Sequence, residues 1–145
     1  MRISTKGRYA IRLMVDLAEN DTGEYIALKD VSARQGISVK YLEQIVRQLS
    51  NSGYLKSVRG PQGGYRLAKK PDKYTVGDIL RITEGSMAPV ACLDDEVNEC
   101  PYYAQCSTIS LWEGLYEKVN EYIDGITLED VVNQHKAKNG MDYVI

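Results

Sequence analysis

The feature that most limits how this 145-residue chain folds is an amphipathic helical pattern that runs directly into a glycine-rich hairpin pattern. The helical pattern covers residues 39–52, where Ser38 is suited to cap the N-terminus and Gly53 to end the helix. Its apolar residues recur at i, i+3, i+4 and i+7, which places them on one face against a core. These residues are Leu42, Ile45, Val46 and Leu49.

Residues 54–59 and 65–68 have the composition of two short strands, and the loop between them contains Gly60, Gly63 and Gly64. A short helix is expected at 28–35, followed by a tight turn at a glycine. A helix, a turn, a second helix with a polar outer face and a hairpin together form a winged helix-turn-helix. We therefore predict a mainly α fold with a small β-wing, in which residues 1–73 are the winged helix-turn-helix domain.

Charged residues are distributed unevenly along the chain. Residues 1–73 hold 14 Lys and Arg against 7 Asp and Glu, a net charge of +7, whereas residues 74–145 have a net charge of -9. DNA is a polyanion, so we expect it to bind the basic half. Lys6 and Arg8, at the start of a helix predicted at 4–20, are expected to contact phosphates. Long donors and acceptors on the outer face of the 39–52 helix suit base edges and phosphates, namely Lys40, Tyr41, Glu43, Gln44, Arg47 and Gln48.

Residues 74–145 are predicted to form a second region with short helices at 75–84 and 127–136, a tail at 140–145 and a long dimerisation helix at 108–124. The long helix carries two apolar stripes, so it needs two partners. We expect one stripe to pack on the chain's own core and the other on a second copy, which predicts a homodimer; the alternative is one broad surface facing the core. The predicted dimer stripe is Ile109, Trp112, Tyr116, Val119 and Ile123, and its neighbour is Leu111, Leu115 and Tyr122.

Three cysteines, Cys92, Cys100 and Cys106, lie within fifteen residues in the loop that leads into the long helix. An odd number argues against a set of structural disulfides. Zinc sites commonly have four ligands and closer Cys pairs, and the single histidine, His135, lies on a different predicted helix.

The remaining patterns favour a protein that is not an enzyme. No spacing suggests a Ser, His and Asp set, and a Cys-x-x-Cys redox motif is absent from the sequence. No apolar run is long enough to span a bilayer, and the first residues lack the apolar region of a secretory signal. We expect a cytoplasmic protein that does not contact membranes.

Five segments carry a resemblance that runs nearly from end to end. They are residues 1–10 (MRISTKGRYA), 41–44 (YLEQ), 58–65 (VRGPQGGY), 77–79 (GDI) and 127–130 (TLED). Together they resemble the family of bacterial winged-helix regulators that includes the iron-sulfur cluster regulator IscR, the nitric oxide sensor NsrR and the cysteine-metabolism repressor CymR. The resemblance implies a transcriptional regulator, built as a dimer of DNA-binding domains crossed by a long helix. We expect a repressor, because steric blocking of a promoter requires nothing further from the protein.

The resemblance also implies which residues read DNA. Ser38 joins Lys40, Tyr41, Glu43 and Gln44 in facing the major groove, while Arg59 enters the minor groove. Arg suits a narrow minor groove because its negative potential is strong. The glycines of the wing and Tyr65, which carry the shared wing motif, complete the expected DNA-binding set.

For the three cysteines, the resemblance implies that they bind an iron-sulfur cluster, most simply 2Fe-2S. The cluster would be the sensor of a protein that regulates genes of iron-sulfur cluster biogenesis or of sulfur and cysteine metabolism. Soft thiolates suit such a cluster, while zinc and metal-free reduced thiols are the alternatives. The fourth ligand is open, because the family's His position holds Ile109 and the acidic position of some relatives holds Arg8. Asp94, Asp95, Glu96, Glu99 or a small exogenous molecule are the candidates.

A second branch of the resemblance points to CymR. The segment 83–90 and the C-terminal tail resemble that repressor, which pairs with cysteine synthase. The active site of cysteine synthase also accepts the C-terminal Ile of serine acetyltransferase, so a terminal Ile with a free carboxylate could bind there. The alternative function is thus a cluster-free repressor of cysteine metabolism that binds cysteine synthase through Tyr143, Val144 and Ile145, and the bland alternative is an ordinary frayed terminus.

Overall fold

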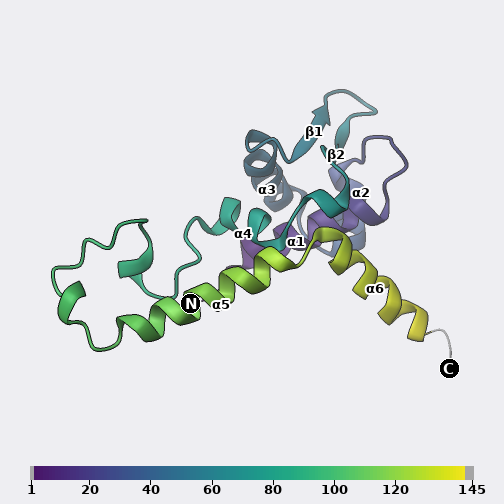
Figure 1. Cartoon of the computed structure of the whole chain (residues 1–145). Coiled ribbons are helices and arrows are strands. Elements are labelled where there is room, and N and C mark those ends of the chain that lie inside the picture. The colour runs from purple at the N-terminus through teal and green to yellow at the C-terminus, as the bar shows by residue number, and fades with distance from the viewer. Residues whose placement is uncertain (1, 143–145) are drawn as a thin grey trace.

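The computed structural model describes residues 2–142, with side chains for residues 2–140. The helices are α1 (Thr5–Glu19), α2 (Leu28–Gln35), α3 (Val39–Asn51), α4 (Val76–Glu84), α5 (Ile109–Gly125) and α6 (Leu128–Asp142). The strands β1 (Leu55–Val58) and β2 (Gly64–Leu67) pair antiparallel, and short 3₁₀ turns lie at Pro71–Lys73, Ala91–Leu93 and Tyr103–Gln105. Figure 1 shows a compact head with the wing at one side and α5 extending away from it. The predicted fold class is confirmed.

Helix α1 lies at the centre of the head and packs against α2, α3, α4, α6 and β2. Its apolar residues Ala10, Leu13 and Met14 are fully buried, and they belong to the same core as the apolar stripe of α3. The same core continues beyond Lys73, where Tyr74 and Leu128 are also fully buried. The division of the chain after Lys73 remains a prediction, and α4 and α6 share the core of the head.

Local capping explains where three of the helices begin. At α4, the Thr75 hydroxyl accepts from the Asp78 backbone N–H at 3.0 Å, and the Asp78 carboxylate accepts from the Thr75 N–H at 3.1 Å. Thr127 and Asp130 form the same pair of bonds at α6. Ser38 caps α3 by accepting from the Tyr41 N–H at 3.2 Å. All three caps were expected from the sequence.

Helix α6 corrects the prediction for the C-terminal region, since it continues to Asp142 instead of ending near residue 136. Gly140 lies inside the helix where a tail was expected. A glycine in a helix costs only about 1 kcal/mol, so it does not end one by itself. The predicted partner-binding residues Tyr143, Val144 and Ile145 lie outside the described residues.

Helix α5 resolves the question of its two stripes in part. Ile123 is 8% exposed and packs with Leu80 and Met87 of its own chain, with Tyr116 and Val119 partly buried beside them. This placement corrects the assignment of Ile123 to a dimer contact, because its side chain is already covered. The other stripe is exposed: Leu111 at 61%, Leu115 at 40% and Tyr122 at 69%. None of the described helices is long and apolar enough to cross a membrane.

Candidate DNA-binding surface

The outer face of α3 is open to solvent along most of its length. Lys40, Glu43, Gln44 and Arg47 are all exposed, while the opposite face of the helix is buried. The left-handed Gly36, with φ of 68°, ends α2 and lets the chain turn before α3 begins. Because the buried face fixes the rotation of α3, the four polar side chains must point outward together.

Tyr41 differs from the expected outward position, because its ring is partly buried. It meets the ring of Tyr9 on α1 edge to face, with centroids 5.6 Å apart. The Arg12 guanidinium lies 5.2 Å from the centre of that Tyr9 ring. This contact joins the basic N-terminal half of α1 to the start of α3, which the sequence did not reveal. Gln48 is also partly buried rather than fully outward.

The wing is a two-stranded hairpin in which Leu55 pairs with Leu67 and Val58 with Gly64. Arg59 is exposed and follows directly after β1. Gly60 has a φ of 114°, a conformation that side-chain-bearing residues rarely adopt. The wing loop therefore presents Arg59 at a glycine-controlled turn.

Two other residues of the wing motif have clear structural roles. Tyr65 exchanges backbone hydrogen bonds with Ile26, at 2.8 and 2.9 Å, which ties β2 to the segment before α2. A Cβ on Gly64 would lie 2.2 Å from the Ile26 carbonyl oxygen, so only glycine allows this approach. Gly64 and Tyr65 therefore have a structural role, which is to attach the wing to the segment before α2, and this role does not depend on any contact with DNA.

The N-terminus of α1 is fixed by α4. The Glu84 carboxylate accepts from the Ser4 backbone N–H at 3.1 Å and from the Ser4 hydroxyl, while that hydroxyl caps α1 at Gly7. Arg8 is exposed and Lys6 is partly exposed on the first two turns. Both predicted phosphate contacts thus lie on a helix end with a defined position.

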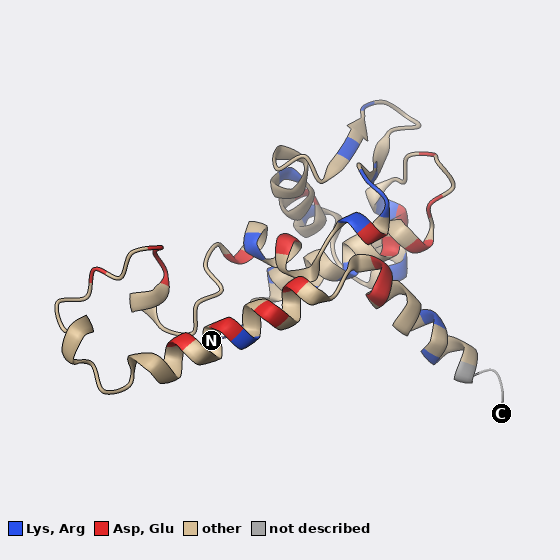
Figure 2. Ribbon diagram, in the orientation of Figure 1, with Lys and Arg blue, Asp and Glu red and all other residues tan. Residues whose placement is uncertain are grey.

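Charge separates along the molecule as the sequence predicted. Figure 2 shows Lys and Arg on α3, on the hairpin and in the segment after β2, while Asp and Glu line α5 and the loop before it. The positive field therefore belongs to the head and the negative field to the extension.

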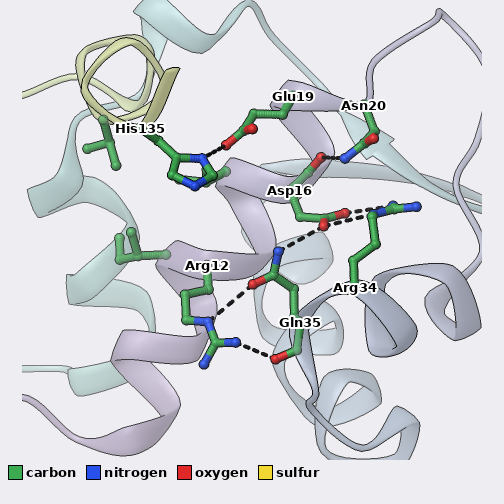
Figure 3. Close-up of a pocket in the computed structure, with 10 residues that line it drawn as sticks. Arg12, Asp16, Glu19, Asn20, Arg34, Gln35 and His135 are labelled. Carbon is green, nitrogen blue, oxygen red and sulfur yellow. Dashed lines mark hydrogen bonds and ion pairs between the residues drawn. The ribbon is translucent and has the colours of Figure 1, made fainter. Parts of the chain in front are cut away.

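A polar network beneath the turn of the helix-turn-helix was missed at the level of sequence (Figure 3). Asp16 is 3% exposed and accepts from Arg34 through Nε at 3.0 Å and Nη2 at 2.8 Å, and from the Gln35 amide at 2.9 Å. The hydrogen bond to Asp16 is the main cause of a raised pKa for Arg34. A signal did exist, because Asp16 lies among the buried residues of α1, where a carboxylate requires partners.

The cysteines are free and partly buried, but the structure does not gather them. Within residues 2–142, no group of three or more His, Cys, Asp or Glu side chains is placed to hold a metal ion. The three thiols are therefore not preassembled as a cluster site in that part of the chain. Cys106, beside the start of α5, has a lowered pKa, chiefly because its sulfur lies 3.6 Å from the Thr108 hydroxyl.

Comparison with known proteins decides the family. A family model described as "Rrf2: Iron-dependent Transcriptional regulator" matches residues 3–134. The chain belongs to the Rrf2 family. This Rrf2 chain is 40% identical to the transcriptional regulator CymR of Bacillus subtilis, over 92% of the chain and 91% of that protein. It is 37% identical to IscR of Pectobacterium atrosepticum, over 98% of the chain and 85% of that protein.

The solved structure of CymR from B. subtilis, described as the global cysteine regulator of that organism, superposes on this Rrf2 chain with a TM-score of 0.75. It has 36% identity and covers 92% of the chain and 98% of CymR. The expected resemblance and the expected function as a transcriptional regulator are confirmed. The relatives include both IscR and CymR, so they do not separate the two predicted forms of regulation.

Proposed function

We propose that this protein is a homodimeric repressor that binds a two-fold symmetric DNA site, with α3 in the major groove and the wing on the minor groove. The observation that carries the proposal is the exposed polar face of α3 beside a basic hairpin and the basic start of α1. A helix of this kind presents side chains to base edges, and the surrounding Lys and Arg hold the phosphates. The exposed stripe of Leu111, Leu115 and Tyr122 on α5 supports pairing with a second copy.

Glu43 provides the test of base reading. Its carboxylate can accept from cytosine but repels phosphates, so Glu43→Ala is expected to lose selectivity of about 1 to 3 kcal/mol at one base pair. Non-specific affinity should rise at the same time, because a negative charge leaves the surface. The probe would be a DNA sequence that the protein selects from a pool of random duplexes. Fluorescence anisotropy would then measure the base selectivity and the non-specific affinity.

The control for this test is Glu117→Ala, which removes an exposed carboxylate from α5. We expect it to leave selectivity unchanged. If Glu43→Ala kept the same preference at every position of the selected sequence, α3 would not be the reading helix.

For the signal, the proposal is an iron-sulfur cluster on Cys92, Cys100 and Cys106, with the fourth ligand unassigned. Its support is the position of three soft ligands on one loop and the similarity to IscR. Protein purified without oxygen should be coloured and contain iron and sulfide, and Cys100→Ser should lose the colour. A colourless, iron-free preparation would contradict it, as would unchanged absorption in Cys100→Ser.

The second candidate is a repressor of cysteine metabolism that has no cluster and is controlled by cysteine synthase, which would bind the C-terminal Ile of the repressor. It is favoured by the similarity to CymR and by the ungathered cysteines. The same anaerobic preparation separates the candidates, because this one predicts no visible absorption.

A further inference from the structure

A hollow of about 560 Å³ lies between α1, α2 and α6. Three apolar side chains, Ile11, Val15 and Val131, form part of its wall. Polar side chains from all three helices form the rest, as Figure 3 shows. A cavity of this size with a mixed lining is typical of sites for small organic molecules.

The charged side chains of the hollow differ in how completely their charges and hydrogen-bond donors are paired. The charge of Asp16 is neutralised by Arg34. The Glu19 carboxylate accepts a hydrogen bond from Nδ1 of His135 at 2.6 Å. Arg12 forms no ion pair among the described residues: its Nε and Nη2 donate to the side chain and backbone of Gln35, and its guanidinium lies beside the Tyr9 ring. Its Nη1 has no hydrogen bond within that part of the chain. Arg12, which is exposed, thus keeps one free donor at the edge of the hollow and forms no ion pair in that part of the chain.

We propose that this hollow binds a small monocarboxylate with an apolar body. The carboxylate would accept from Arg12, while the body would lie on Ile11, Val15 and Val131. Arg12 and Glu19 are seven residues apart on α1, so the hollow extends about 10 Å along the helix axis. Asp16 and Glu19 line the same hollow, and they disfavour a doubly charged anion such as phosphate more strongly than a monocarboxylate because the repulsion grows with the charge of the ligand.

The position of the site gives such a ligand a mechanical role. Gln35 ends α2 directly before the Gly36 turn that leads to α3, and Val131 lies on α6, which follows the long helix α5. A molecule held by Arg12, which bonds Gln35, and by Val131 would link α6 to the residue that precedes the Gly36 turn. This inference goes beyond the proposed DNA-binding function, and its test requires no DNA.

The probe is 3-phenylpropionate, titrated into the full-length protein and followed by calorimetry. We expect saturable binding, and binding of the neutral 3-phenylpropanamide should be at least about tenfold weaker because it lacks the charge for Arg12. Val131→Trp should remove binding by filling the hollow, and Arg12→Met should weaken it at least about tenfold. The matched control is Lys136→Met, on the exposed surface of α6, which should bind as the unmodified protein does.

Three results would overturn the proposal. The first is no binding of 3-phenylpropionate, butyrate or octanoate by protein with an unchanged circular dichroism spectrum. The second is equal binding of inorganic phosphate, which would contradict the ligand class. The third is binding that both Val131→Trp and Arg12→Met leave unchanged, which would place the molecule elsewhere.

Discussion

Arg34→Met is expected to lower the free energy of unfolding by about 3 to 5 kcal/mol. The side chain of Asp16 is 2% exposed, whereas that of Arg34 is 38% exposed. Removing Arg34 therefore leaves a buried carboxylate with the Gln35 amide as its remaining side-chain donor among the described residues. An uncompensated buried charge costs far more than the removal of a surface ion pair. Urea denaturation followed by circular dichroism would measure the difference.

The double variant Asp16→Asn, Arg34→Met supplies a test of the cause. It removes both charges, so we expect it to be more stable than Arg34→Met alone. Lys29→Met, on the exposed surface of the same helix, should change stability by less than about 0.5 kcal/mol. If the double variant were the least stable of the three, packing and not the buried charge would explain the effect.

Elements with local signals were predictable from the sequence. The capping residues Ser38, Thr75 and Thr127 begin helices where expected, because each cap needs only bonds within one turn. The same holds for the buried stripe of α3, since periodicity alone determines which of its residues share a face. Prediction of the fold class therefore needed no knowledge of distant contacts.

Features that depend on distant partners were not predictable in the same way. The bond between Asp16 and Arg34 joins residues eighteen apart, and the sequence contains several other candidates for each. Both stripes of α5 are apolar, and only the positions of Leu80 and Met87 show that the stripe with Ile123 is the one covered by the same chain. Tyr41 faced outward by helical periodicity, yet it packs on Tyr9 because α1 passes beside the start of α3.

The cysteines are close along the chain, and that closeness did not translate into proximity in space. Cys92 lies inside the turn at Ala91–Leu93, and the turn at Tyr103–Gln105 lies between Cys100 and Cys106; neither turn was expected in the loop. Spacing therefore suggested a ligand set that residues 2–142 of a single chain do not assemble. Ligand chemistry and ligand geometry are separate requirements for a metal site.

Arg59→Ala is expected to reduce affinity for the selected DNA sequence by about 1 to 3 kcal/mol, or roughly 5- to 150-fold. The side chain is exposed at the end of β1, and its guanidinium is drawn to the strong negative potential of a narrow A·T-rich minor groove. The loss should be accompanied by weaker preference at one A·T-rich position. Anisotropy titrations with the selected duplex and with duplexes altered at single positions would measure both.

Lys56→Ala and Lys6→Ala are the matched comparisons, because they also remove exposed or partly exposed positive charges. Both are expected to weaken binding to all sequences alike and to reduce the dependence of affinity on salt by about one unit of slope for each phosphate that is no longer neutralised. Arg59 alone should change the preferred sequence. Specific affinity that Arg59→Ala left untouched would mean that the wing lies away from the groove, and the proposed orientation of the head on DNA would then be wrong.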